Sequence, residues 1–199
     1  MTQKQQRCTP VVHPDIEILG QMRTVSDALV WALAYLGAMR RITHRPAIVL
    51  DIDGTVLKNY DNDVAKCVVG FRPFVQACVG AGIAVFIVTA RPDTPSNREW
   101  TVQQMIACDL WQYIVPRDGL YMREPSRDTG PFKFASREDI RKRGYTILLS
   151  VGDQFLDLAR KVPKSDIDNH EIWVGTLGDN NSLAIKLPSE FPRGDTPTP

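Results

Sequence analysis

The chain alternates between short, nearly unbroken apolar runs and longer segments in which apolar residues recur at helical spacing. The apolar runs predict strands at 47–51, 83–88, 113–115, 120–122, 146–151, 171–174 and 184–187. The segments of helical spacing predict helices at 24–41, 70–82, 96–108 and 135–143. Strands that alternate with helices are typical of a parallel sheet with right-handed crossovers. We therefore expect an α/β fold of three layers, α/β/α and Rossmann-like, with a mostly parallel sheet in the centre.

Two of the predicted helices begin with pairs of residues typical of capping boxes. Thr24 is followed three residues later by Asp27, and Ser96 is followed by Glu99. The helix at 24–41 is apolar on more than one face, which indicates burial on two sides. We expect this helix to pack on the domain, and a homodimer contact is the alternative.

The composition fits one folded domain. With 199 residues, of which 43% are hydrophobic, the chain can bury one core but is short for two. Prolines among polar residues indicate a flexible arm at 1–20, and the polar end of the chain indicates a disordered tail at 188–199. The folded domain is expected to span 21–187.

Charge and cysteine content narrow the class of protein. There are 24 basic and 23 acidic residues, so no overall charge attracts the chain to nucleic acid or to an anionic membrane. Cys8, Cys67, Cys78 and Cys108 form no CxxC pair, and we expect reduced, buried thiols. The first residues lack an apolar signal core, and the apolar stretch 28–39 is too short to span a bilayer. A cytoplasmic protein without membrane contact is predicted.

Polar side chains follow the ends of three predicted strands. Asp51 and Asp53 follow the first, Thr89 follows the second, and Asp153 and Asp157 follow a later one. Because the carboxyl ends of parallel strands share one edge of a sheet, these side chains can converge. Neighbouring carboxylates repel each other when ionised, so the group calls for a cation or a shared proton. Mg²⁺, which takes oxygen ligands, is the metal that such a set favours.

A phosphoryl group is the ligand that fits this convergent set better than calcium does. A calcium-binding loop beginning at the sequence DIDG would need glycine at its sixth position and glutamate at its twelfth, where this chain has Val56 and Asn62. For a phosphoryl group, Thr89 supplies a hydroxyl, Lys133 supplies a positive charge, and an aspartate can attack phosphorus. Taken singly, Thr89 could be a cap and Lys133 a solvated charge.

Four segments occur in the order of the motifs of a known superfamily. DIDGT, VTAR, Lys133 and VGDQFLDL resemble the four motifs of the haloacid dehalogenase (HAD) superfamily of phosphotransferases. The block FKFASREDIRKRGYTILLSVGDQFLDL and the later IKLPSEFP resemble subfamily IIIB, which contains the class B and plant vegetative-storage-type acid phosphatases. The resemblance implies the HAD fold. The segments 56–83 and 92–132 are too short for a large cap domain, so an open site is expected.

The resemblance also implies roles for individual residues. Asp51 would be the nucleophile that forms an aspartyl-phosphate, and Asp53 the general acid and base. Thr89 and Lys133 would hold the phosphoryl oxygens. Mg²⁺ would be bound by the Asp51 side chain, the Asp53 backbone carbonyl and Asp153. A further carboxylate, Asp157, would orient that shell or the lysine.

Residues beside the motifs complete the predicted substrate site. Gly54, Ala90 and Arg91 adjoin the phosphoryl-binding residues, and members of the subfamily often carry glutamate at the position of Gly54. Arg91 could meet a second phosphate or a substrate edge, and a surface salt bridge is the alternative. The residues after the first strand, Lys58, Asn59 and Tyr60, could form the rim of the site.

The predicted function is Mg²⁺-dependent hydrolysis of a small-molecule phosphomonoester or a phosphorylated macromolecule. One alternative is a polynucleotide 3′-phosphatase, because LYMREPSRDTGPFK resembles the phosphatase half of polynucleotide kinase-phosphatases. The nucleic-acid backbone would then be contacted by basic residues, namely Arg123, Arg127, Arg137, Arg141, Lys142 and Arg143. An alternative of another class is a non-catalytic phosphate-binding or scaffold protein that keeps the fold. The intact pair Asp51 and Asp53 favours an enzyme.

Overall fold

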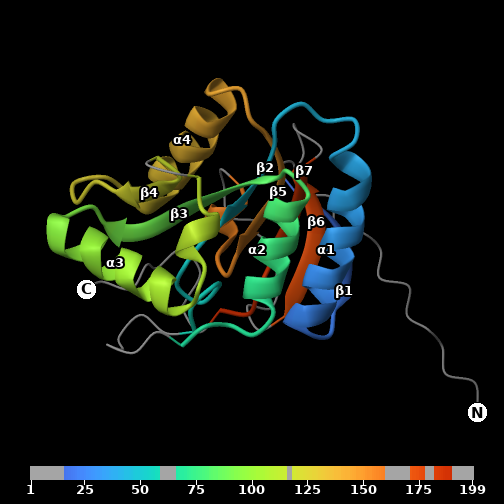
Figure 1. Cartoon of the computed structure of the whole chain (residues 1–199), viewed down its shortest axis with the longest axis horizontal. Helices are drawn as coiled ribbons and strands as arrows, with labels where there is room; N and C mark the ends of the chain where they lie inside the picture. Colours follow the sequence, from blue (N-terminus) through green and yellow to red (C-terminus); the bar gives the residue numbers. More distant parts are fainter. Residues whose placement is uncertain (1–15, 59–65, 116–117, 160–170, 178–181, 190–199) are drawn as a thin grey trace, which may run out of the picture.

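Strands and helices alternate along the chain in the computed structural model, which describes residues 16–58, 66–115, 118–159, 171–177 and 182–189 (Figure 1). The strands are β1 Ile16–Met22, β2 Pro46–Leu50, β3 Ala84–Pro92, β4 Leu120–Arg123, β5 Thr146–Gly152, β6 Ile172–Leu177 and β7 Ser182–Lys186. The helices are α1 Val25–Met39, α2 Phe71–Gly80, α3 Pro95–Ala107 and α4 Thr129–Lys142, with the 3-10 turns η1 Trp111–Tyr113 and η2 Phe155–Asp157.

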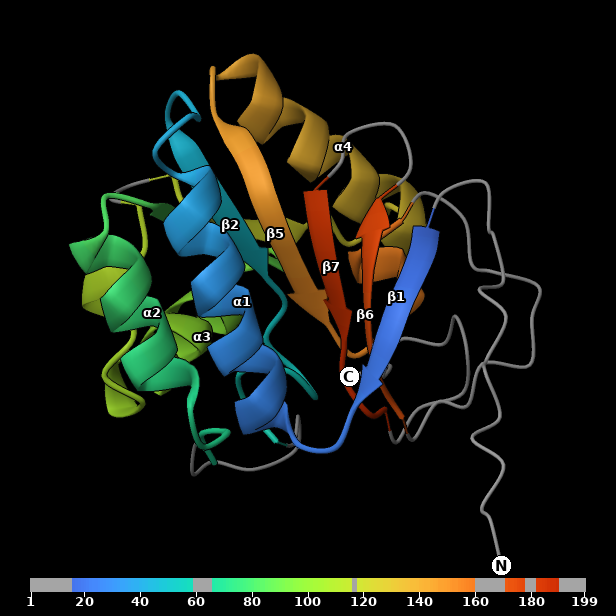
Figure 2. The same ribbon diagram turned by 90° about the vertical axis from the view of Figure 1, so that its right-hand side faces the viewer.

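The strands form one sheet in the order β1-β6-β7-β5-β2-β3-β4. Strands β7, β5, β2, β3 and β4 pair in parallel, whereas β6 is antiparallel to both of its neighbours, β1 and β7 (Figure 2). Strand β2 lies in the interior of the sheet, where Leu50 pairs with Ile87 of β3 and with Val151 of β5. The mostly parallel central sheet predicted from the sequence is confirmed.

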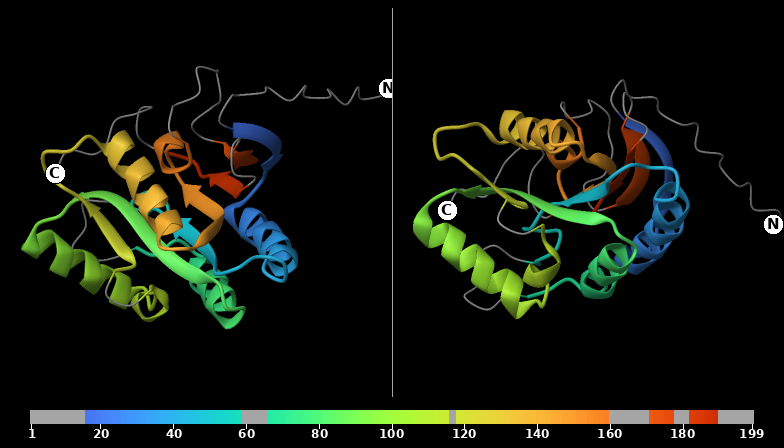
Figure 3. Two further views of the ribbon diagram at one scale, coloured as in Figure 1. Left: turned by 90° about the horizontal axis from the view of Figure 1, so that it is seen from above. Right: turned by 45° about the horizontal axis from the view of Figure 1, so that its top comes forward.

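Helices cover both faces of this sheet, which gives the expected three layers. Helix α4 lies on one face, and α1, α2 and α3 lie on the other (Figure 3). In β2, Ile48 and Leu50 join the core beneath α1 and α2, while Ala47 and Val49 join the core beneath α4. The strand is buried on both faces, which explains why its sequence is continuously apolar.

Helix α1 packs on the domain, as the sequence predicts. Ala28, Leu29, Ala32 and Leu36 are buried, and the helix contacts α2 and β5. The side chain of Val30 faces outward and is 67% exposed. The homodimer contact stays a prediction.

The start of α1 confirms one predicted cap, and the start of α3 corrects the other. The Asp27 backbone N–H donates to Thr24 Oγ1 at 3.1 Å. Helix α3, however, begins after Thr94, whose Oγ1 accepts from the Asn97 backbone N–H at 3.3 Å. The predicted cap at Ser96 is wrong because Pro95 occupies the first helical position, where its fixed φ and missing N–H are favourable.

Several boundaries also differ from the predictions. The sequence predicts a flexible arm at 1–20, but residues 16–20 belong to β1, and the rest of that arm lies outside the described residues. Helix α4 begins at Thr129, six residues before the predicted start, so Lys133 lies inside the helix. The strand predicted at 113–115 is the end of η1 followed by a single bridge from Ile114 to Val85.

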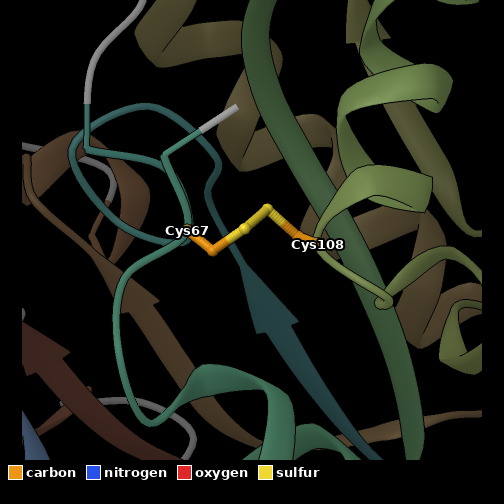
Figure 4. Close-up of a disulfide and its surroundings, with 2 residues drawn as sticks. All are labelled: Cys67 and Cys108. Carbon is orange, nitrogen blue, oxygen red and sulfur yellow. A yellow bond between two sulfur atoms is a disulfide. The ribbon is translucent and has the colours of Figure 1, made fainter. Parts of the chain in front are cut away.

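A disulfide joins Cys67 to Cys108, which corrects the expectation of reduced thiols (Figure 4). The two residues are 41 positions apart in the sequence, and the fold brings their Cα atoms to 5.7 Å, within the usual range for a disulfide. Cys78 is a free, buried thiol as predicted, and Cys8 lies outside the described residues. Because stable disulfides are rare in the cytosol, the cytoplasmic prediction loses one of its grounds. Within the described ranges, no helix is long and apolar enough to cross a membrane.

Candidate active site

The polar residues gather at the carboxyl edge of the sheet, where the chain order reverses around β2. Asp51 directly follows β2, and its backbone N–H donates to the Val151 carbonyl of β5 at 3.0 Å. Asp153 directly follows β5, so the two carboxylates come from neighbouring strands. Ligands of open α/β sheets bind in the crevice at such a switch point.

Three buried aspartates and one lysine form what we call the carboxylate cluster: Asp51, Asp153, Asp157 and Lys133. One oxygen from each aspartate lies within 4.8 Å of the others. The four residues are between 2% and 4% exposed. Lys133 reaches the cluster from α4, on the opposite side of the sheet from α1 and α2. The grouping of Asp51 with Asp153 and Lys133 that the sequence predicts is therefore present.

Lys133 is the cation of the carboxylate cluster. Its Nζ donates to Asp51 Oδ1 at 2.8 Å and forms a second, closer ion pair with Asp157 Oδ1. Burial opposes the charge of the lysine, but the carboxylates of Asp157 and Asp51 outweigh burial and raise the pKa of Lys133. The lysine is therefore a fixed positive charge, as predicted, and its two ion pairs and its burial hold the side chain in place.

The carboxylates of the cluster are not fully neutralised by this lysine. Burial, followed by the charge of Asp157, raises the pKa of Asp51 well above its ordinary value, even though Lys133 opposes the shift. Burial and the charge of Asp157 also raise the pKa of Asp153, to about 6. Three carboxylates around one ammonium favour a further cation, and an all-oxygen set fits Mg²⁺. The residues present therefore fit the predicted metal.

Hydrogen bonds from neighbouring residues orient two of these aspartates. Asp153 Oδ2 accepts from Ser189 Oγ at 2.6 Å and from Gln154 Nε2 at 3.3 Å. Asp157 Oδ2 accepts from the Gln154 backbone N–H at 2.9 Å. Ser189 is buried, which corrects its assignment to a disordered tail; residues 190–199 lie outside the described residues. In the sequence, Ser189 is noticed only as part of the segment IKLPSEFP, which resembles the subfamily. Its contact with Asp153 could not be predicted, because that contact depends on the fold.

Asp53 is engaged by Arg91 in a two-bond ion pair. Arg91 Nε donates to Asp53 Oδ2 at 2.8 Å, and Arg91 Nη2 donates to Asp53 Oδ1 at 2.7 Å. The Arg91 side chain is 1% exposed and that of Asp53 is 11% exposed. The salt bridge that the sequence offers as the alternative for Arg91 is therefore present, but it is not at the surface, because the Arg91 side chain is buried. The predicted contact of Arg91 with substrate stays a prediction, and its guanidinium is held by Asp53.

The other predicted phosphoryl-binding residues lie close to these groups. Thr89 is buried in β3, and its Oγ1 accepts from the Arg91 backbone N–H at 3.3 Å. The Ala90 carbonyl accepts from Arg123 Nε at 3.0 Å. Gly54 has φ +74°, and a Cβ at this position would come within 2.7 Å of Asp153 Oδ2. The positive φ and the close approach to the cluster therefore favour glycine at this position.

Most of the basic residues considered for nucleic-acid binding have partners within the domain. Arg137 is 2% exposed, and its Nη1 donates to the Asp157 carbonyl at 2.6 Å. Burial lowers the pKa of Arg137 to about 10. Arg141 pairs with Glu138, and Arg143 Nη2 pairs with Asp118 at 2.9 Å. Arg137 is therefore not placed to contact a phosphate backbone. Of the predicted rim, Lys58 is exposed, and Asn59 and Tyr60 lie outside the described residues.

Comparisons with known proteins place the chain in a family. The model of HAD superfamily, subfamily IIIB (acid phosphatase), matches residues 63–189, so the match begins after Asp51 and Asp53. The chain is similar to a class C acid phosphatase from Bacillus anthracis with tungstate bound, with 18% identity and a TM-score of 0.49, over 68% of this chain and 67% of that one. It is also similar to a D,D-heptose 1.7-bisphosphate phosphatase from B. bronchiseptica complexed with magnesium and phosphate, with 20% identity and a TM-score of 0.44, over 58% of this chain and 74% of that one. A comparison with curated proteins gives no match. The chain belongs to the acid phosphatases of HAD subfamily IIIB and is an enzyme that hydrolyses phosphomonoesters.

Proposed function

We propose that this phosphatase works through an aspartyl-phosphate on Asp51 and depends on Mg²⁺. In the first step an Asp51 oxygen attacks phosphorus, the ester P–O bond breaks, and Asp53 gives its proton to the leaving oxygen. In the second step water attacks phosphorus, the bond between phosphorus and the Asp51 oxygen breaks, and Asp53 takes the proton of that water. Inorganic phosphate leaves, and both aspartates return to their starting state.

The observation that carries this proposal is the position of Asp51 inside the carboxylate cluster. Its carboxylate lies at the carboxyl edge of the sheet, and Lys133 Nζ lies 2.8 Å from Oδ1. A nucleophilic carboxylate must be ionised; burial and the charge of Asp157 raise the pKa of Asp51, whereas the adjacent ammonium, together with the proposed metal ion, favours the ionised form. The same ammonium can hold a phosphoryl oxygen beside the nucleophile, together with the Thr89 hydroxyl.

The metal part of the proposal is supported by the surplus of carboxylates in the cluster. The Asp51 side chain, the Asp53 backbone carbonyl and Asp153 would hold Mg²⁺, while Asp157 orients Lys133 and Ser189 orients Asp153. Bound there, the ion would neutralise charge on the phosphoryl oxygens. The protein supplies the fixed oxygen ligands and their supporting hydrogen bonds.

The substrate is proposed to be a small phosphomonoester or a phosphorylated macromolecule reached through an open site. In the described part of the chain, the segments between the motifs form α2, α3, η1 and β4 and add no separate cap domain. The family assignment favours this enzyme over a non-catalytic scaffold. The internal pairing of Arg137, Arg141 and Arg143 gives the polynucleotide 3′-phosphatase alternative no structural support.

Asp51→Asn tests the nucleophile. The variant keeps the size of the side chain but cannot form the acyl phosphate, so turnover of phenyl phosphate should fall by at least about a thousandfold. Rapid acid quench with radiolabelled substrate should trap label on the wild-type protein and none on the variant.

The matched control is Asp118→Asn, at an exposed carboxylate just before β4, at the opposite edge of the sheet. It should turn over and trap label like the wild type. Near-normal turnover by Asp51→Asn, or label trapped on that variant, would rule out Asp51 as the nucleophile.

A further inference from the structure

We propose that Arg91 is a positioning residue for the general acid and base. Its guanidinium holds the Asp53 carboxylate in the orientation from which it transfers protons. This inference rests on the proposed function, because it assumes the proton-transfer role of Asp53. It assigns to the arginine of the VTAR segment a task other than contact with substrate.

The geometry of the pair fixes the plane of the carboxylate. Two N–H groups of one rigid guanidinium reach the two Asp53 oxygens at 2.8 and 2.7 Å. A single hydrogen bond would let the carboxylate rotate about χ2, whereas two parallel bonds define its plane. An ionised carboxylate has about four lone-pair positions, so further positions remain for the proton that Asp53 carries.

Arg91 is itself held in place by α3. Its Nη1 donates to Thr101 Oγ1 at 3.1 Å, and its guanidinium lies 4.4 Å from the centroid of the Trp100 ring. Thr101 is fully buried, and Arg91 is among the largest fully buried side chains. A stacked and hydrogen-bonded guanidinium has little freedom to move, so it can transmit a fixed position to Asp53.

The same helix is also tied to the backbone beside Asp53. Asp53 forms a backbone bridge with Leu57, and Leu57 forms one with Cys67. Cys67 is bonded to Cys108, which caps the C-terminus of α3 (Figure 4). Helix α3 therefore supports Asp53 by two routes, one through the Arg91 side chain and one through the disulfide.

The exposure of the two partners agrees with a supporting role. The Arg91 side chain is 1% exposed, whereas that of Asp53 is 11% exposed. Asp53 reaches farther toward solvent than Arg91 does, and the Arg91 guanidinium is occupied by Asp53, Thr101 and the Trp100 ring. These contacts suit a residue that acts through Asp53.

Leaving-group dependence separates positioning from direct substrate contact. The ratio kcat/KM covers the steps up to formation of the aspartyl-phosphate. Phenolate is a poor leaving group that needs the proton of Asp53, whereas 4-nitrophenolate leaves with little help. Loss of a substrate contact lowers kcat/KM for both aryl phosphates alike, and loss of proton transfer lowers it selectively for phenyl phosphate.

The central variant is Arg91→Lys, which keeps the charge but loses the fork. Its kcat/KM for phenyl phosphate should fall at least about tenfold more than its kcat/KM for 4-nitrophenyl phosphate, since general acids contribute about 10²–10⁴-fold. In an Asp53→Asn background, Arg91→Lys should leave the ratio between the two substrates unchanged, because the residue acts through Asp53.

Arg98→Lys is the matched control. Arg98 forms the same two-bond pair with Asp93, at 2.9 and 2.8 Å, but its side chain is 42% exposed. This change should leave the substrate ratio at the wild-type value. Thr101→Val removes one hydrogen bond to Arg91 and preserves the shape of the side chain. It should lower kcat/KM selectively for phenyl phosphate, but by less than Arg91→Lys does. It carries the test if Arg91→Lys does not fold.

If Arg91→Lys lowers kcat/KM equally for both substrates, the inference is overturned. If Arg91→Lys does not fold, an equal loss of kcat/KM for both substrates in Thr101→Val has the same consequence. A further change of the ratio when Arg91→Lys is added to Asp53→Asn would also overturn it. Asp53→Asn alone tests the proposed function separately: an unchanged ratio in that variant removes the acid role of Asp53, whatever Arg91 does. A changed ratio in Asp53→Asn with an unchanged ratio in Arg91→Lys defeats only the inference.

Discussion

The two carboxylates of DIDGT lie two residues apart but stand in opposite electrostatic surroundings. Asp51 belongs to the carboxylate cluster, in which three acids face the single ammonium of Lys133. Asp53 belongs to a one-to-one pair with Arg91. The three carboxylates of the cluster outnumber its one ammonium, whereas Asp53 is paired with the Arg91 guanidinium. The carboxylate cluster, one half of the site, therefore favours a further cation, and the Asp53–Arg91 pair, the other half, does not.

Different elements of the fold hold the carboxylate cluster and the Asp53–Arg91 pair. The cluster is assembled from the ends of β2 and β5 with Lys133 from α4. The pair is supported by α3, through Thr101 and the disulfide at the end of the helix. Substitutions on α4 should therefore alter the charge of the cluster and its affinity for metal. Substitutions around α3 should alter the position of Asp53 and the stability of the fold.

Among the changes that separate the two halves of the site, Lys133→Met should produce the largest effect. Removing the ammonium of the carboxylate cluster leaves buried carboxylates unpaired, so we expect the metal-free protein to lose about 3–5 kcal/mol of unfolding free energy. Loss of a charge at the phosphoryl group should lower kcat by at least about a hundredfold. Urea unfolding and steady-state kinetics measure the two changes, and Mg²⁺ should stabilise the variant more than the wild type.

The control is Lys142→Met, at an exposed lysine in the last turn of α4. It should change the unfolding free energy by less than about 0.5 kcal/mol. If Lys133→Met were as stable as this control without metal, the cluster would not be short of positive charge, and the contrast with Asp53 would disappear.

Cys67→Ser should destabilise the protein without affecting the metal half. The disulfide closes a loop of 41 residues of sequence separation, for which the chain-entropy relation gives about 4 kcal/mol of unfolding free energy. Urea unfolding of the oxidised protein, with and without reductant, measures this loss. The Mg²⁺ affinity should stay within about twofold of the wild type, because the disulfide lies on the side of the pair.

Cys78→Ala provides the matched cysteine control, since Cys78 is buried and free. That variant should still lose stability when reductant is added, whereas Cys67→Ser should not respond. A reductant effect of equal size in Cys67→Ser would show that the stability does not come from this bond. A large drop in the Mg²⁺ affinity of Cys67→Ser would show that the disulfide also affects the carboxylate cluster, so that the two halves are not independent.

The sequence predicts the cluster well and the pair poorly, for a physical reason. Asp51 and Asp153 follow strands and Lys133 lies in a helix, all elements with local sequence patterns, and parallel topology then brings the strand ends together. The partner of Asp53 is 38 residues away, and the contact depends on how α3 packs under Arg91. The disulfide likewise depends on where α3 ends, because no local sequence pattern indicates which cysteine pairs with which. The predicted start of α3 was wrong because Pro95 sets the first helical position, whereas the capping pattern placed it at Ser96.

Metal dependence should vary with pH in a direction set by the raised pKa values of the cluster. Burial and the charge of Asp157 raise the pKa of Asp153 to about 6, against about 3.9 in an unfolded chain. Between these values the folded, metal-free protein binds a proton that the unfolded chain has released, so its stability falls as pH rises from about 4 to 6. Mg²⁺ must displace that proton, and its affinity should therefore rise over the same interval.

A chelator should stop turnover, and the Mg²⁺ concentration that restores half of it should rise by about tenfold for each pH unit below about pH 6. Thermal unfolding titrated with Mg²⁺ at pH 5, 6 and 7 measures the same affinity without turnover. Asp153→Asn should bind Mg²⁺ weakly and lose most of this pH dependence, while Asp118→Asn should retain it. Turnover that survives the chelator, or an affinity equal at pH 5 and 7, would mean that Lys133 alone balances the three aspartates. In that case the surroundings of Asp51 would resemble those of Asp53, and the division of the site into two halves would be wrong.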